Sequence, residues 1–96
     1  MRQVLHTPEA EDDLMEFWLY IALDNPDAAD RVLDAIEQKA QYLLTHPELG
    51  GKRDELAAGL RSLIVGSHIV FYRIFGNDIE IARVLHGARD IERLFH

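Results

Sequence analysis

The sequence of 96 residues contains no cysteine, which removes three kinds of chemistry at once. The chain cannot form a disulfide framework, use a thiol nucleophile or bind a metal through thiolates. No apolar run approaches the roughly 18 residues that a membrane span requires. The N-terminal stretch MRQVLHTPEAEDD also lacks the apolar core of a signal peptide. With a hydrophobic fraction of 48%, the sequence indicates one globular domain over residues 1–96 and a cytoplasmic location.

Lysine is absent after Lys52, and charge is unevenly distributed along the chain. Residues 1–56 carry 13 acidic and 5 basic side chains, whereas residues 57–96 carry 4 acidic and 5 basic ones. These last five basic residues are Arg61, Arg73, Arg83, Arg89 and Arg93. Nucleic-acid binding depends on clustered cations that release counterions from phosphates, so the acidic part would repel a polyanion. The arginines could bind carboxylates or phosphates, and an acidic protein partner fits this distribution as well as RNA does.

Two helices are predicted in the first half of the chain. Thr7 can cap a helix that starts at Pro8 and continues to about residue 23. Asn25 and Pro26 repeat this signal for a second helix, which must end before Pro47. Because the connection is short, the helices should pack as an antiparallel hairpin. The expected core positions are Ala10, Leu14, Phe17 and Ile21 in the first helix, and Ala29, Val32, Leu33, Ile36, Ala40, Leu43 and Leu44 in the second.

Strands are predicted at both ends of the chain, and residues 47–59 read as a loop. The predicted strands span 2–6, 60–65, 68–75 and 79–86, with a two-residue turn at Gly66-Ser67 and a second turn at 76–78. The last three strands form an antiparallel meander. The fold class is therefore α+β, in the order β-α-α-β-β-β, with the helical hairpin packed on an antiparallel sheet and a short helix over 88–96.

Both faces of the predicted sheet are apolar. In the strand over 79–86, simple alternation places Ile79, Ile81 and Leu85 on one face, and Ala82 and Val84 on the other. Two helices can cover only one face of a four-stranded sheet. Either an apolar segment of a partner or the C-terminus of the chain must therefore cover the rest.

Few residues offer catalytic chemistry. The histidines show no metal-ligand spacing and the chain has no phosphate-binding or dinucleotide motif, so we expect no metal and no cofactor. One enzymatic hypothesis remains, a metal-free ribonuclease in which His86 is an acid or base and arginines stabilise the phosphorane. Its candidate catalytic residues are Arg61, Arg73, Arg83 and His86. Structural roles are the alternative, because Arg83 can pair with an acid and Tyr72 can be a core tyrosine with a satisfied hydroxyl.

Four stretches together resemble the ParE toxins of the RelE/ParE superfamily. They are NPDAADRVLDAI, HPELGGKRDELAAGLRSLIVG, FYR and RVLHGARD. The resemblance implies the toxin of a type II toxin–antitoxin pair of the plasmid-stabilising kind. A ParD-like antitoxin would fold its tail onto the toxin, supply the missing apolar cover and make any DNA contact.

The same resemblance implies that the protein inhibits DNA gyrase by binding and is not an enzyme. The alternatives are a RelE-like, ribosome-dependent mRNA endoribonuclease and a non-toxic protein-binding module. The ending LHGARD and the acidic balance favour the ParE branch. In this interpretation Gly87 ends the last strand, and the candidate partner-binding residues are Phe17, Trp18, Arg61, Tyr72, Arg73, Arg83, His86 and Arg89.

Overall fold

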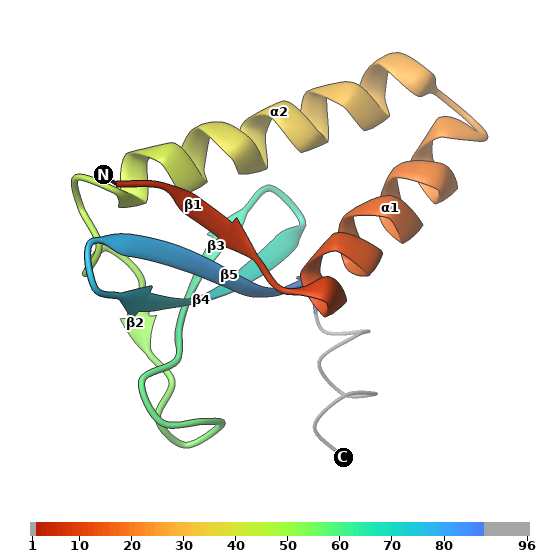
Figure 1. Cartoon of the computed structure of the whole chain (residues 1–96). Coiled ribbons are helices and arrows are strands. Elements are labelled where there is room, and N and C mark those ends of the chain that lie inside the picture. The colour runs from red at the N-terminus through yellow and green to blue at the C-terminus, as the bar shows by residue number, and fades with distance from the viewer. Residues whose placement is uncertain (1, 88–96) are drawn as a thin grey trace.

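A computed structural model describes residues 2–87, in which two helices lie over one face of a five-stranded sheet (Figure 1). The elements are β1 (Val4–His6), α1 (Pro8–Ala22), α2 (Pro26–Leu43), β2 (Gly51–Lys52), β3 (Arg61–Val65), β4 (His68–Phe75) and β5 (Asp78–His86). The α+β class and the order of the predicted elements are confirmed. Neither described helix is long and apolar enough to cross a membrane. The helix predicted over 88–96 lies outside the described residues.

The sheet differs from the prediction in two respects. Its strand order is β1-β5-β4-β3-β2, and β1 pairs with β5 in parallel, so the sheet is mixed and not wholly antiparallel. The partner of β1 is the last strand in sequence, and local patterns carry no information about such a distant pairing. The second difference is β2, which lies in the predicted loop and pairs with β3 through two residues, too few to show a period.

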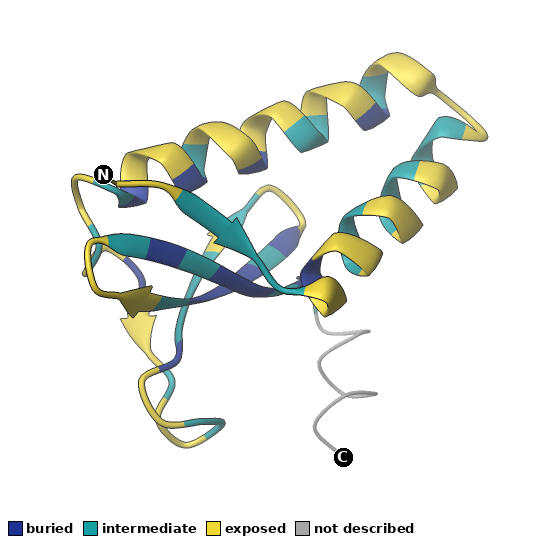
Figure 2. Cartoon of the chain, in the orientation of Figure 1, coloured by how far each residue is buried: buried dark blue, intermediate teal, exposed yellow. Residues whose placement is uncertain are grey.

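The helices begin where the capping signals predict. The Thr7 hydroxyl accepts a hydrogen bond from the backbone N–H of Ala10 at 3.0 Å, and the Asn25 side chain accepts one from that of Ala28 at 3.1 Å. The indole N–H of Trp18 donates to Asp30 at 2.9 Å and so joins α1 to α2. The buried positions lie on the sides of the helices that face the sheet (Figure 2).

A β-bulge in β5 changes which side chains face the helices. Phe71 of β4 pairs with Arg83, but the next residue, Tyr72, pairs with Ile81, so Ala82 is an extra residue. The core beneath the helices accordingly contains Ile79, Ile81 and Val84, whereas Ala82 and Leu85 join a second cluster with Leu60 and Phe71. The predicted faces of Val84 and Leu85 are therefore wrong, because simple alternation does not anticipate an inserted residue. The loop residues Leu56 and Ala57 pack against this second cluster.

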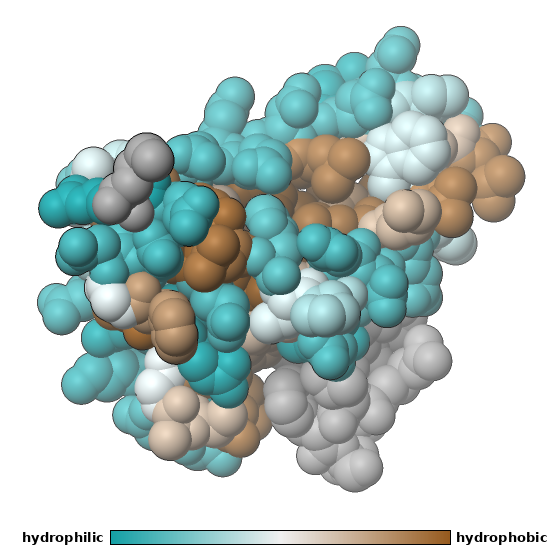
Figure 3. Space-filling model, in the orientation of Figure 1, coloured by the Kyte–Doolittle hydropathy of each residue, from teal (hydrophilic) through white to brown (hydrophobic). Residues whose placement is uncertain are grey.

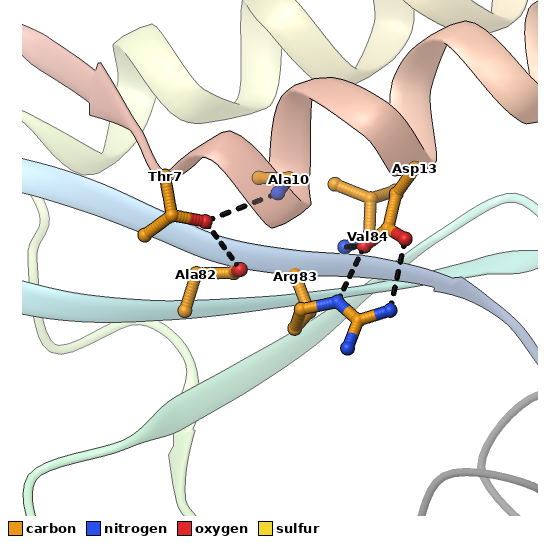
Figure 4. Close-up of polar contacts among 6 residues, drawn as sticks. All are labelled: Thr7, Ala10, Asp13, Ala82, Arg83 and Val84. Carbon is orange, nitrogen blue, oxygen red and sulfur yellow. Dashed lines mark hydrogen bonds and ion pairs between the residues drawn. The ribbon is translucent and has the colours of Figure 1, made fainter.

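The first turns of α1 are fastened to β5 at this bulge (Figure 4). The Thr7 hydroxyl donates to the carbonyl of Ala82 at 2.7 Å. The Asp13 carboxylate accepts from Nε and Nη2 of Arg83 at 2.7 and 2.9 Å, and from the backbone N–H of Val84 at 3.0 Å. Only 11% of the Asp13 side chain is exposed, so this pairing is stronger than a surface ion pair. These bonds fix the position of α1 on the sheet.

We expect Asp13→Ala to lower the free energy of unfolding by about 1–3 kcal/mol, because it removes the carboxylate that accepts from the half-buried Arg83 guanidinium and from the buried Val84 N–H. The matched control is Asp12→Ala, which removes an exposed carboxylate from the same helix and should change stability by about 0.5 kcal/mol or less. Urea unfolding followed by circular dichroism measures both. Equal stability of the two variants would contradict the role assigned to Asp13.

Candidate functional site

A groove of about 1000 Å³ opens between the helical hairpin and the end of the sheet where the β3–β4 turn meets the end of β5. Its apolar lining includes Phe17 and Ile21 of α1, Val32 of α2, and Val65 and Val84 of the sheet. Figure 3 shows apolar side chains in the space between α2 and the sheet. The charged lining consists of Asp13, Glu16, Arg31 and Arg83. This combination suits an amphipathic segment better than a small polar molecule.

Three aromatic rings line one part of the groove. The ring of Phe17 packs against that of His68, with centroids 4.5 Å apart. His68 is only 5% exposed, and its ring meets that of His86 edge-on at 5.5 Å. The two histidines are opposite each other on β4 and β5. The cluster of three rings therefore depends on Phe17 of α1 and on the pairing of His68 with His86 in the sheet.

The structure brings three of the predicted partner-binding residues together. Phe17, Arg83 and His86 all line the groove, and the guanidinium of Arg83 is bound to Asp13. Trp18 is half-buried and bonded to Asp30 outside the groove lining. Arg89, the remaining candidate near the C-terminus, lies outside the described residues.

Arg61 and Arg73 lie toward the other end of the sheet. Arg61 donates to the carbonyl of Gly50 at 2.8 Å, and Arg73 lies 3.9 Å from Glu80. Along β4, Arg73 is five residues from His68, the partner of His86, a separation of about 17 Å. The four candidate nuclease residues are thus not brought around one point. Within residues 2–87, no three His, Asp or Glu side chains come together as a metal site requires.

Tyr72 is a core residue that anchors the loop after α2. Its side chain is completely buried; its hydroxyl donates to the carbonyl of Pro47 at 2.7 Å and accepts from the N–H of Gly50 at 2.8 Å. A Cβ at Gly50 would lie 2.6 Å from the Tyr72 ring, so glycine is required there. Burial raises the pKa of the Tyr72 hydroxyl. The core-tyrosine alternative is therefore confirmed, and Tyr72 cannot contact a partner from this position.

The sequence did not lead us to predict Asp13, whose carboxylate accepts hydrogen bonds from both Arg83 and Val84 at the site. A signal was present, because Asp13 follows Ala10 by three residues and precedes Phe17 by four, which places a carboxylate within an apolar helical stripe. A carboxylate at such a position is buried only when it has a partner. Other groove residues on α2, such as Ala28 and Ala35, carried no signal because alanine suits any part of a helix.

Comparisons with known proteins identify relatives across almost the whole chain. The family model described as "ParE toxin of type II toxin-antitoxin system, parDE" matches residues 4–91. Toxin ParE1 of Mycobacterium tuberculosis is 34% identical over 92 residues, with 93% of each chain covered. Toxin RelE3 of Caulobacter vibrioides is 32% identical over 91 residues, which cover 91% of this chain and 96% of the relative. Toxin ParE1 of the same species is 37% identical over 81 residues, or 82% of each chain.

A solved structure shares the fold. The chain described as "Chromosomal ParDE TA system from P. aeruginosa" superimposes with a TM-score of 0.73 at 23% sequence identity. The match covers 91% of this chain and 97% of that one. The arrangement of two helices on one sheet is therefore shared by both proteins.

The Tyr72 anchor can be tested with Tyr72→Phe, which leaves the Gly50 N–H and the Pro47 carbonyl without their buried partner. We expect a loss of about 1–3 kcal/mol of unfolding free energy near pH 8. The pKa of Tyr72 is raised in the folded state. Its contribution should therefore be complete below the ordinary tyrosine pKa of about 10 and should decline as the pH rises above that value.

Urea unfolding at several pH values measures this difference, with Tyr20→Phe, at an exposed tyrosine, as the control. The stability gap between wild type and Tyr72→Phe should narrow above pH of about 10. A gap that is constant with pH would contradict the buried, protonated hydroxyl.

Proposed function

Because the chain belongs to the ParE toxin family of type II toxin–antitoxin systems, we propose that it binds and inhibits DNA gyrase and that a ParD-like antitoxin neutralises it. The observation that carries the proposal is the groove between the hairpin and the sheet. A toxin that acts by binding needs a surface for its target, and its antitoxin needs a surface on which its tail can fold.

The groove has the chemistry that an amphipathic antitoxin tail requires. Its apolar lining, from Phe17 and Ile21 to Val65, can bury hydrophobic anchors spaced along a helix. The carboxylate of Glu16 and the guanidinium of Arg31 can bind charged side chains of the tail and fix its direction. Folding such a tail costs ordering entropy, which burial of apolar surface on both partners offsets.

Two observations support binding in preference to RNA cleavage. The arginines that a nuclease would use are distributed among separate structural roles, with Arg61 on a loop carbonyl, Arg73 near Glu80 and Arg83 on Asp13. The chain also carries a formal charge of −7, which opposes the binding of a polyanion. Gyrase is a protein target and does not require this chain to hold nucleic acid itself.

The second candidate function is ribosome-dependent cleavage of mRNA, as in RelE-type toxins. Its support is the identity of 32% with Toxin RelE3 and the pair of His68 and His86 in the groove. An imidazole can act as general acid or base near neutral pH. In this alternative the groove would be an active site and not only a docking surface.

Purified protein assayed for gyrase supercoiling and for ribosome-dependent mRNA cleavage separates the two functions. We expect the wild type to inhibit supercoiling and to cleave no mRNA. His86→Gln should also cleave no mRNA, and its inhibition of supercoiling should equal that of wild type unless His86 itself contacts gyrase. Loss of a general acid or base lowers a rate by about 10²- to 10⁴-fold. Cleavage of mRNA that falls by such a factor in His86→Gln would overturn the gyrase proposal in favour of the nuclease.

The docking of the antitoxin in the groove can be tested with Ala35→Arg, which adds a large side chain to the lining from α2. The matched control is Gln38→Arg, at an exposed position of the same helix outside the groove lining. Both substitutions add one positive charge and suit a helix. The binding partner in this test is a ParD-like antitoxin, chosen because it binds the wild-type chain.

We expect Ala35→Arg to weaken antitoxin binding at least about tenfold, a loss of about 1.4 kcal/mol, while Gln38→Arg binds like wild type. Isothermal titration of the purified proteins measures the affinities. Equal affinity of both variants and wild type would exclude the groove as the docking site.

A further inference from the structure

The exposed side of α1 carries two rows of exposed side chains, the second of which borders the groove. Residues four positions apart lie one above another on a helix, so each row follows the helix axis. We call these seven residues the α1 outer face; they are Glu11, Met15, Leu19 and Leu23 in one row, and Asp12, Glu16 and Tyr20 in the other. Four of them are apolar or aromatic, three are acidic and none is basic.

The apolar and aromatic members are all exposed. Leu23 is 89% exposed and Leu19 is 53% exposed, and Met15 and Tyr20 are exposed as well. Figure 3 shows apolar side chains gathered at the end of the hairpin, where α1 turns into α2. A single exposed leucine is ordinary, but several in adjacent helical positions indicate an interaction surface.

The charge around this surface has one sign. Residues 8–43, which form the hairpin, contain ten acidic and two basic residues, whereas the remainder of the chain contains seven acidic and eight basic ones. In α1 itself there are five acidic residues and no basic one. Among the described residues, Asp13 is the only carboxylate of α1 in an ion pair, and it points toward β5 rather than outward. A partner on the outer face therefore meets carboxylates that favour lysine or arginine.

A second copy of this chain fits the surface poorly. If two outer faces met with parallel helices, Glu11, Asp12 and Glu16 of each would oppose the same residues of the other. If the helices were antiparallel and centred on residue 17, midway between Glu11 and Leu23, Glu16 of one copy would approach Glu16 of the other. Both arrangements place like charges close together at an apolar interface, where their repulsion is strong. The occupant must be a different protein.

We propose that the α1 outer face binds an amphipathic helix of a partner protein, one whose apolar ridge is flanked by lysine or arginine. The four-residue rows of α1 suit the packing of a second helix, whose ridges fit the grooves between them. From Glu11 to Leu23 the face is about 18 Å long, so it accommodates three to four turns of a helix. It is distinct from the groove, because Leu19 and Leu23 do not belong to the groove lining, although Glu16 and Tyr20 border both surfaces. The proposal does not depend on gyrase or on the antitoxin.

The test uses the full chain and two synthetic helical peptides of about 18 residues, long enough to cover the face. The basic peptide has leucines four residues apart flanked by lysines, and the acidic peptide has glutamates in place of the lysines. The variant Leu19→Gln/Leu23→Gln removes the apolar contacts, and Ile64→Gln, at an exposed isoleucine of β3, is the control. Circular dichroism establishes that all variants fold, and fluorescence anisotropy of labelled peptide measures binding.

We expect the basic peptide to bind wild type and Ile64→Gln equally, and Leu19→Gln/Leu23→Gln at least about tenfold more weakly. A second variant, Glu11→Gln/Asp12→Asn, should bind more weakly at low salt and show less decline as salt rises to about 0.15 M, where exposed charges are screened. The acidic peptide should not bind.

Three results would overturn the proposal. The first is equal binding of the basic and acidic peptides. The second is binding of the basic peptide that Leu19→Gln/Leu23→Gln does not change, or no binding to wild type at all. The third is a dimer in analytical ultracentrifugation that Leu19→Gln/Leu23→Gln abolishes, because it would assign the face to a second copy of the chain.

Discussion

The position of α1 depends on the carboxylate of Asp13. It accepts hydrogen bonds from the Arg83 guanidinium and the Val84 amide, at the point where a bulge in β5 shifts the alternation of side chains. The bulge turns Val84 toward the helices, and the bond from its N–H to Asp13 fixes α1 at the same place. Both features hold α1 where the ring of Phe17 packs against that of His68 in the lining of the groove. The site is thus a consequence of one buried charge and one extra residue.

The two ends of the sheet are stabilised by different means. At the end away from the groove, the buried Tyr72 hydroxyl holds the loop through Pro47 and Gly50, and Arg61 binds a carbonyl of the same loop. At the groove end, the charged lining is only partly engaged within the protein, since Arg83 is paired with Asp13 while Glu16 and Arg31 face the groove. Arginines that look equivalent in the sequence therefore have separate roles. Those near the loop stabilise the fold, whereas the groove presents its own charges to a partner.

Features that depend on residues close together in the sequence could be predicted, whereas features that depend on the pairing of distant segments could not. Thr7-Pro8 and Asn25-Pro26 specify the starts of both helices locally, and Gly66-Ser67 specifies a two-residue turn, with Gly66 at φ 61°. The bulge at Ala82 has no local signature, so the faces of Val84 and Leu85 were wrong. For the site, Phe17, Arg83 and His86 were three of the eight partner-binding candidates, and all three line the groove. Arg61 and Arg73 lie away from the groove because of the register in which β3, β4 and β5 pair. This register depends on contacts between distant segments, so local sequence patterns do not predict it.

α1 lies between two surfaces that differ in chemistry, the groove and the α1 outer face. Its inner side is fixed by Asp13 and Phe17, whose partners belong to the sheet, and by Trp18, whose partner is on α2. Its outer side carries apolar residues framed by carboxylates alone. A helix held by both the sheet and α2 presents its exposed side in a defined orientation, so little conformational entropy is lost when something binds there. Glu16 and Tyr20 lie on the exposed side of α1 and also line the groove. The two surfaces are therefore physically adjacent, and these two side chains belong to the edges of both.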